Sequence, residues 1–152
     1  MASLTDVPSL ALGDEVAEGL ASGRGVVALE STLLAHGLPP DRRREVALRL
    51  EAVVRAEGAV PATVAVVDGR LRLGLDDGTL ARVIDGRAKK ASLRDLAPAV
   101  ALGGVWATTV ATTMAIAHRG GARWFATGGV GGVHRGAVDT FDESADLLAL
   151  AR

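Results

Sequence analysis

The stretch Phe125–Asp146, which reads FATGGVGGVHRGAVDTFDESAD, decides the fold of this chain. It begins inside a short apolar strand, Trp124-Phe125-Ala126, and turns at Thr127. Four glycines then occupy positions 128, 129, 131 and 132, and glycine allows backbone conformations and close approaches that other residues hinder. A short apolar strand that runs through a glycine turn toward a helix is typical of an α/β protein.

The residues that follow the glycines suit a phosphorylated ligand. His134 and Arg135 can both carry positive charge, and backbone amides beside cationic groups are what a phosphate monoester requires. Asp142, Glu143 and Asp146 then place carboxylates at the expected start of a helix. The combination indicates a small phosphorylated substrate together with a divalent metal.

The same stretch also admits a packing role. Glycine-rich turns between strands and helices occur in many α/β proteins for packing alone. This loop departs from the known phosphate-binding spacings, because His134 interrupts G-x-G-x-x-G and Ala137 follows Gly136 where the Walker pattern has lysine. The residues alone leave ligand binding and packing both open.

Composition bounds the class of protein. A length of 152 residues suits one domain with a real core, so residues 1–152 are predicted to form a single α/β domain. Hydrophobic residues make up 49% of the chain and aromatics only 3%, so small aliphatic side chains must fill the core. The net charge of −1 argues against a nucleic-acid polymer as partner, and the lack of cysteine excludes disulfides and thiol catalysis.

The first residues predict neither export nor membrane anchoring. Acidic side chains at Asp6, Asp14 and Glu15 interrupt any signal-peptide core, and no apolar run reaches membrane-spanning length. We therefore expect a soluble, cytoplasmic protein that has no membrane partner.

Hydrophobic patterning predicts alternating strands and helices. Buried strands are expected at 25–29, 62–67 and 123–126, and Asp68-Gly69 predicts a hairpin after the second strand. Helices are expected at 14–20, from Asp41 to Gly58, at 77–84, after Ser92, at 108–118 and from Asp142. Asp41 is expected to cap the second helix, whose apolar face would be Val46, Leu50, Val53 and Val54. Ser92 with Asp95 predicts a variant of the capping box.

Polar residues at the ends of these elements are the candidates for chemistry. Glu30 directly follows the strand 25–29, where ligands of α/β proteins bind, so it suits general acid work or the capping of nearby amides, and position favours neither. Thr108 and Thr109 begin a helix, where capping is the default and phosphate binding the alternative.

Asp142 and Asp146 lie four residues apart, which predicts that they share a helix face. Two aspartates so placed can hold Mg²⁺ or Mn²⁺. An acidic first turn stabilised by the helix dipole explains the same spacing and is favoured by spacing alone.

Four segments, in order and spacing, resemble the pseudouridine-5′-phosphate glycosidase family. They are ALESTLLAHG at Ala28–Gly37, KASLRDL at Lys90–Leu96, ATTVATTM at Ala107–Met114, and TGGVGGVHRGAVDTFDESADL at Thr127–Leu147. The resemblance runs through almost the whole chain, and the last segment is the most specific. It implies an enzyme of the C-glycosidase or lyase type, which reversibly cleaves the C–C bond between uracil and ribose 5-phosphate.

The resemblance implies a role for each candidate residue. Glu30 would be the proton donor or acceptor, Asp146 would contact the substrate and take a second acid/base role, and Asp142 would bind Mn²⁺ or another divalent cation. Lys90 and His134 would contact the phosphate. The full set of implied substrate contacts is Lys90, Thr109, Val110, Thr127, His134, Ser144, Ala145 and Asp146.

One departure from the family concerns the nucleophile. A C–C glycosidic bond has no oxygen or nitrogen leaving atom to protonate, so an imine between the opened sugar and a lysine supplies the electron sink. The family carries that lysine on the next strand, and this sequence ends at Arg152 before reaching it. Lys89 and Lys90 are the lysines present, and the resemblance assigns Lys90 to the phosphate.

The expected fold is a three-layer α/β/α domain with a mostly parallel sheet, truncated relative to the family. The family assembles as trimers and an open apolar edge favours self-association, so a homo-oligomer is expected. The first functional hypothesis is a pseudouridine-5′-phosphate glycosidase that is incomplete as the isolated chain. The alternative is an inactive sugar-phosphate-binding or assembly module, or one half of a split enzyme whose companion chain supplies the C-terminal half.

Overall fold

The computed structural model of the chain describes residues 10–132, 135–140 and 144–151. Seven strands in these residues form one mixed sheet. The strands are β1 (Leu10–Leu12), β2 (Val26–Leu29), β3 (Val60–Val67), β4 (Arg70–Leu73), β5 (Lys89–Ala91), β6 (Val105–Thr108) and β7 (Trp124–Ala126). Of the six strand pairings that connect them, β1–β4, β2–β3, β2–β7 and β5–β6 are parallel, and β3–β4 and β3–β6 are antiparallel.

The sheet is built on β3, whose eight residues are all buried. One edge of β3 pairs with β4 through the turn at Asp68 and Gly69, where φ is +50° and +77°. Two successive residues with positive φ are what a tight hairpin of this twist needs, so the predicted Asp-Gly hairpin is confirmed. β1 then lies parallel beside β4 and ends that side of the sheet.

The other edge of β3 is shared by two strands that run toward each other. β2 lies parallel to residues 60–63, and β6 lies antiparallel to residues 65–67. The carboxyl ends of β2 and β6 therefore meet beside Thr63 and Val64. β7 runs parallel beside β2 and β5 runs parallel beside β6, so all four strands end at one place, which we call the strand junction.

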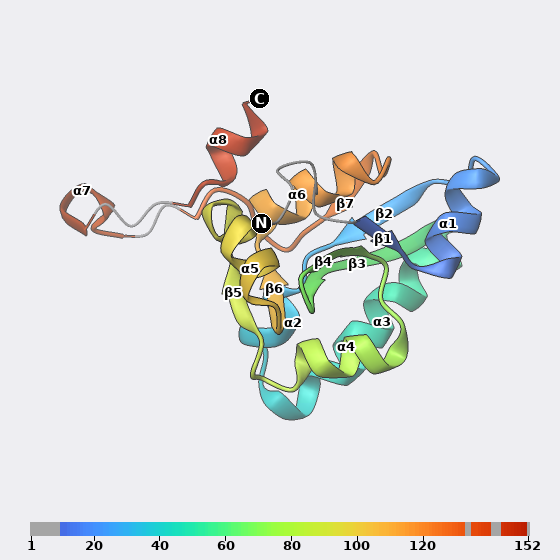
Figure 1. Cartoon of the computed structure of the whole chain (residues 1–152), viewed down its shortest axis with the longest axis horizontal. Coiled ribbons are helices and arrows are strands. Elements are labelled where there is room, and N and C mark those ends of the chain that lie inside the picture. The colour runs from blue at the N-terminus through green and yellow to red at the C-terminus, as the bar shows by residue number, and fades with distance from the viewer. Residues whose placement is uncertain (1–9, 133–134, 141–143, 152) are drawn as a thin grey trace, which may run out of the picture.

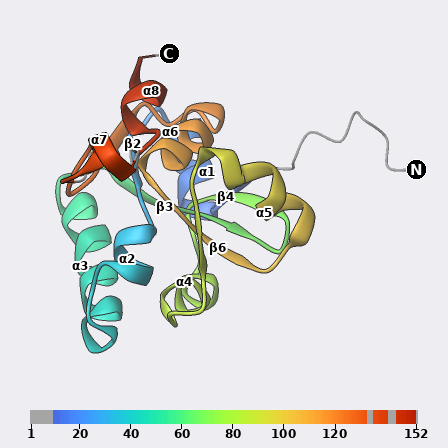
Figure 2. The same cartoon turned by 90° about the vertical axis from the view of Figure 1, so that its left-hand side faces the viewer.

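Helices cover both faces of the sheet, as Figures 1 and 2 show. Alternate residues of β3, namely Val60, Ala62, Val64 and Val66, pack on one face under α1 (Asp14–Ala21), α5 (Leu96–Leu102) and α6 (Val110–Arg119). The opposite face is covered by α2 (Thr32–His36), α3 (Arg43–Ala56) and α4 (Asp77–Ile84). The expected three-layer α/β/α arrangement with a mostly parallel sheet is confirmed.

Short elements complete the description. Two 3₁₀ turns, Pro40–Arg42 and Leu93–Asp95, precede α3 and α5. The glycine loop leads to α7 (Ala137–Thr140), and α8 (Asp146–Leu150) follows. Across the part of the chain that the structure describes, no helix combines the length and the apolarity needed to cross a bilayer.

Some predicted boundaries are wrong. Asp41 does not cap α3, because it lies within a 3₁₀ turn and the helix begins two residues later. The expected face of α3 is partly right: Val46 and Leu50 pack against the core, but Val53 is 55% exposed, and Ala47 and Glu51 are the buried residues.

The prediction of a last helix from Asp142 is also wrong, because Ser144 and Ala145 are non-helical and α8 begins at Asp146. Asp142, whose predicted helix face was shared with Asp146, lies outside the described residues. The strands β1, β5 and β6 were not predicted.

The hairpin turn supplies a test of the fold. A Cβ at position 69 would lie 2.8 Å from the carbonyl oxygen of Val100, whereas a Cβ at Gly58 would meet nothing within 4 Å, although φ is about the same at both, +77° and +79°. We expect Gly58→Ala to cost about 1–2 kcal/mol for its backbone conformation, and Gly69→Ala to cost a further ~1–3 kcal/mol for the overlap. Urea unfolding of both variants measures the difference, and equal losses would contradict the described packing of α5 on the hairpin.

Candidate active site

The strand junction places Glu30 beside Thr127. Glu30 follows β2 and Thr127 follows the neighbouring parallel strand β7, so both residues lie at the carboxyl ends of adjacent strands. The Thr127 hydroxyl donates a hydrogen bond of 2.6 Å to Glu30 Oε1, and the amide of Gly129 donates to the Thr127 hydroxyl at 3.3 Å. Glu30 is half-buried. One carboxylate oxygen is thus held, in an environment partly shielded from water.

The start of α6 lies on the opposite side of the junction. Thr109 follows β6 and precedes the helix, and its amide donates to the carbonyl of Ala91 at the end of β5. Thr112 donates its hydroxyl to the same carbonyl at 3.0 Å. Val110, the first helical residue, is 4% exposed. Two bonds to one carbonyl therefore fix the first turn of α6 against β5.

Asp146 caps α6 from a distant part of the chain. Its Oδ1 accepts a hydrogen bond of 3.1 Å from the amide of Ala111, in the first turn of α6, and only 6% of the residue is exposed. A carboxylate is stabilised there because the helix N-terminus carries free amides and a partial positive charge. The amide of Asp146 in turn donates to the hydroxyl of Ser144.

The glycine loop divides into a packed part and an open part. Gly132 has φ +54°, its carbonyl accepts from the Ser144 amide, and a Cβ there would lie 2.7 Å from the Ser144 Cβ. Packing explains that glycine. At Gly128 and Gly129 the φ values are ordinary and a Cβ would meet nothing within 4 Å. Neither conformation nor contact within the described chain demands glycine at these two positions.

A cluster of buried hydroxyls lies between the two sides of the junction. Ser31, which follows Glu30, and Thr108, which precedes Thr109, are both 0% exposed. Each donates its hydroxyl to the carbonyl of Val64, at 2.6 and 2.8 Å respectively. Sequence reasoning did not select Ser31, and it selected Thr108 only as one of two threonines at an expected helix start. The available signal was a hydroxyl at the end of each of two buried strands, where backbone groups lose their sheet partners.

Most of the predicted site residues meet at this place. Glu30 bonds Thr127, and Asp146 bonds Ser144 and the Ala111 amide of α6. Thr109 and Val110 lie at the start of α6, and Ala145 is the residue before α8. Lys90 is exposed on β5, one residue before Ala91. His134 and Asp142, the predicted phosphate and metal contacts, lie outside the described residues.

The expected capping of α6 by the two threonines is wrong. Thr109 is the residue at the cap position, but its side chain makes no capping bond, and Thr108 ends β6 rather than beginning the helix. The physical reason is that Thr108 satisfies a carbonyl of the sheet while the carboxylate of Asp146 takes the Ala111 amide.

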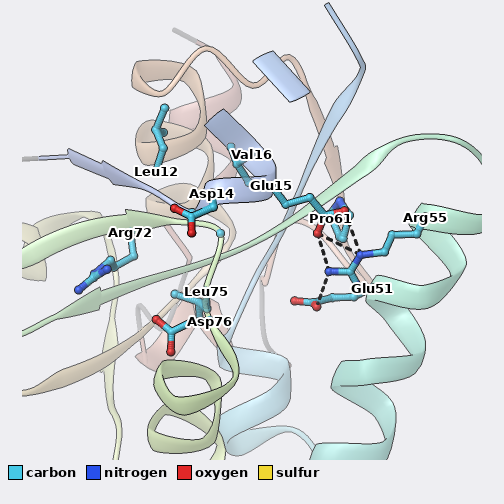
Figure 3. A pocket seen from close by; sticks show the side chains of 12 residues that line it. Leu12, Asp14, Glu15, Val16, Glu51, Arg55, Pro61, Arg72, Leu75 and Asp76 are labelled. Carbon is cyan, nitrogen blue, oxygen red and sulfur yellow. Dashed lines mark hydrogen bonds and ion pairs between the residues drawn. The ribbon is translucent and has the colours of Figure 1, made fainter. Parts of the chain in front are cut away.

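A cavity of about 310 Å³ lies on another side of the molecule, between the start of α1, β4 and α3 (Figure 3). None of the predicted site residues is among those that line it. Arg55 bonds Glu15 at 2.8 Å and Glu51 at 3.3 Å across its wall. The bond from Arg55 lowers the pKa of Glu15. We therefore place the candidate site at the strand junction and not in this cavity.

A metal ion finds no ready cluster in the described residues. No group of three or more histidine, cysteine, aspartate or glutamate side chains within residues 10–132, 135–140 and 144–151 has a spacing that could hold one. Asp146, which the spacing paired with the predicted ligand Asp142, is bonded to the Ala111 amide of α6.

The capping box before α5 orients the end of β5, which carries Lys90. Asp95 Oδ2 accepts from the Ser92 amide at 2.9 Å and from the Ser92 hydroxyl at 2.6 Å, which confirms the predicted capping box. The hydrogen bond from the Ser92 hydroxyl, with that from its amide, lowers the pKa of Asp95 against the opposing effect of burial.

Comparison with known proteins gives one family and close relatives. The sequence model of the family described as "Indigoidine synthase A like protein" matches residues 15–152. The chain is 58% identical over 137 residues to a pseudouridine-5′-phosphate glycosidase of Frankia alni, which covers 90% of this chain and 38% of that protein. It is 54% identical over 145 residues to the one of Sorangium cellulosum, covering 94% and 46%. The chain thus spans half or less of the length of these curated relatives.

Solved structures agree. The prealnumycin C-glycosynthase AlnA in complex with ribulose 5-phosphate matches with a TM-score of 0.81 and 46% identity, over 93% of this chain and 46% of that one. An indigoidine synthase A-like protein from Thermotoga maritima matches with a TM-score of 0.81 and 30% identity, over 95% and 46%.

Asp146 supplies a test of the site geometry. We expect Asp146→Ala to cost about 1–2 kcal/mol of stability and to speed hydrogen exchange of the Ala111 amide, because that amide loses its acceptor. Asp146→Asn keeps an acceptor oxygen and should cost less. Asp139→Ala, at an exposed aspartate of α7, is the control and should leave the exchange unchanged. Unchanged protection of Ala111 in Asp146→Ala would refute the cap.

The capping box predicts a pH dependence. A folded-state pKa below the usual value near 4 means that Asp95 stabilises the fold above that pH, and that this contribution is lost as pH falls through the lowered pKa. We expect Asp95→Ala to cost about 1 kcal/mol at pH 7. Urea midpoints of both proteins between pH 7 and 3 should converge at the acidic end. A difference that grows on acidification would contradict the cap.

Proposed function

We propose, because the chain belongs to the indigoidine synthase A like family, that it is the sugar-phosphate-binding part of a pseudouridine-5′-phosphate glycosidase. The reaction is the reversible cleavage of the C–C glycosidic bond to give uracil and ribose 5-phosphate. The chain spans 38–49% of the length of eight relatives that carry this activity in their names. The glycosidase activity of these longer relatives is therefore assigned to this chain only as a proposal.

The observation that carries the proposal is the meeting of distant segments at the strand junction. Thr127 bonds Glu30 across 97 residues, and Asp146 bonds Ala111 across 35 residues. These residues lie in three of the four segments that resemble the glycosidase family. A chain that only packed would not need to bring a carboxylate, a helix N-terminus and an open glycine loop to the carboxyl ends of the same group of strands.

Glu30 is the proposed acid/base residue. Thr127 holds Oε1, so Oε2 is the atom that exchanges a proton with the substrate. The partly buried position strengthens such a transfer, because fewer waters compete for the carboxylate. Asp146 is the proposed substrate contact and second acid/base residue.

Sugar-phosphate binding is assigned to the remaining residues of the set. Lys90 is exposed on β5, and no ion pair within the described residues competes for its positive charge. Thr109, Val110 and Thr127 line the site, with Ser144 and Ala145 beyond them. Gly128 and Gly129 leave open backbone, where phosphate oxygens can approach the amides. Ribulose 5-phosphate, bound to a related C-glycosynthase, is a ligand of the same chemical class.

The nucleophile is proposed to come from outside these 152 residues. The imine with a lysine is the electron sink that lets the C–C bond break, and the pair present, Lys89 and Lys90, is otherwise assigned. Lys89 lies over the ring of Trp106, 5.0 Å from its centroid. A companion polypeptide that supplies the C-terminal half would complete the enzyme. An inactive sugar-phosphate-binding module is the second candidate, favoured because both lysines present, Lys89 and Lys90, have other assignments.

Three further properties are proposed from the resemblance. Mn²⁺ would bind at Asp142, and no catalytic step is derived through it. The protein would be cytoplasmic. It would assemble as a homo-oligomer, with a trimer as the expected form, and the 67% exposure of Trp124 on β7 supports association.

Titration calorimetry of the whole chain with ribose 5-phosphate tests the proposal. We expect measurable binding that falls at least about tenfold in Lys90→Ala, because a charge-assisted bond to phosphate is lost. Lys89→Ala is the matched control, since it removes a neighbouring lysine that lies over Trp106, and its affinity should equal that of the wild type. Absence of binding, or equal loss in both variants, would contradict the proposal.

Uracil release from pseudouridine 5′-phosphate with Mn²⁺ measures the chemistry. The isolated chain should bind without turnover, and turnover should appear when a C-terminal half from a relative is added. Turnover by the chain alone that vanishes in Lys90→Ala and persists in Lys89→Ala would make Lys90 the nucleophile, contrary to the role proposed for it.

A further inference from the structure

We infer that Ser31 and Thr108 are positioning residues that hold the two sides of the active site at a set separation, an inference that rests on the proposed function. One side carries Glu30 and the other begins at Thr109. Ser31 directly follows Glu30, and Thr108 directly precedes Thr109. A link between Ser31 and Thr108 is therefore a link between the acid/base group and the sugar-phosphate side.

The link is required by backbone groups that the sheet leaves without a strand partner. β2 pairs with β3 up to Thr63, and β6 pairs with β3 from Ala65 onward. The carbonyl of Val64 falls between the two ladders, in the fully buried core. A buried carbonyl without a donor is costly, so something other than a strand must reach it.

Two hydroxyls reach that carbonyl from opposite sides. Ser31 Oγ donates to Val64 O at 2.6 Å, and Thr108 Oγ1 donates to the same oxygen at 2.8 Å. The amide of Thr108 donates to Ser31 Oγ at 2.8 Å, so the two residues also bond each other directly. With one shared acceptor and one mutual bond, neither strand end can shift without breaking a buried hydrogen bond.

The cluster extends to the helix that carries the binding side. Thr113, in the second turn of α6, lies 2.9 Å from Thr108 through their hydroxyl oxygens. Because Thr108 gives its proton to Val64, Thr113 is the donor in this bond. All three hydroxyl residues are 0% exposed. Thr108 therefore joins β2, β3 and α6, and it is the residue on which the separation of the two sides depends most.

A matched control lies on the same strand. Thr63, next to Val64, donates its hydroxyl to Glu51 Oε1 at 2.8 Å and is 1% exposed. That bond joins β3 to α3 on the opposite face of the sheet and touches neither side of the site. Thr63→Val and Thr108→Val each remove one buried hydroxyl with almost no change in shape.

The test compares the affinity for ribose 5-phosphate with the urea midpoint in Thr108→Val, Thr108→Ser and Thr63→Val. Both valine variants should lower the midpoint. Thr108→Val should weaken binding at least about tenfold, a loss of about 1.4 kcal/mol, while Thr63→Val keeps the affinity of the wild type. Thr108→Ser restores the hydroxyl and should return the affinity to within about threefold.

A Thr108→Val protein that binds as tightly as the wild type, or a Thr63→Val protein that loses as much affinity, overturns the inference. If the wild type itself binds no sugar phosphate, the proposed function fails, and amide hydrogen exchange then decides the positioning role. Faster exchange at Thr109 and Ala111 in Thr108→Val but not in Thr63→Val supports it. Equal exchange in the two variants overturns it.

Discussion

The carbonyl of Val64 marks the point where two strands share one edge of β3, and the rest of the structure depends on how that point is closed. β2 arrives parallel and β6 antiparallel, so neither ladder can continue through the other. An open gap would bury polar backbone groups without partners, which costs several kcal/mol in a domain whose total stability is about 5–15 kcal/mol. The hydroxyls of Ser31 and Thr108 donate to the Val64 carbonyl. The gap between the two ladders can therefore lie in the buried core instead of at a sheet edge.

This arrangement also determines where chemistry can occur. In a fully parallel sheet, ligands bind where the strand order reverses, since loops there diverge and leave a crevice. Here the carboxyl ends of β2 and β6 face each other. β7 lies parallel beside β2 and β5 lies parallel beside β6, so these two strands end at the same place. Loops that follow four strands are therefore directed to one place. That explains why Glu30, Thr109 and Thr127 meet although they are far apart in the chain.

Local signals predicted the parts of this structure that local energies determine. The apolar run of β3, the Asp-Gly hairpin and the capping box at Ser92 and Asp95 were all readable, because each rests on residues close in sequence. The antiparallel strand β6 was not, since its four residues read as the approach to a helix and only pairing with β3 makes them a strand. The cap of α6 failed for the same reason: Asp146, 35 residues away, displaces the local threonine. The meeting of the site residues was implied by resemblance and not by any pattern in the residues.

The two tasks of the proposed enzyme make different physical demands. Binding a sugar phosphate requires amides, positive charge and a rigid frame, and these come from contacts within the described chain, such as the Gly132–Ser144 bond that pins the glycine loop. Breaking a C–C bond requires an electron sink. A single lysine amine can supply it from any polypeptide segment that places the amine beside the sugar. A frame held by buried hydroxyls at the strand junction is preorganised before that amine arrives, so binding and bond cleavage are separable in this fold. In the proposed function the strand junction serves binding, and Glu30, which accepts a hydrogen bond from Thr127, takes part in both binding and bond cleavage.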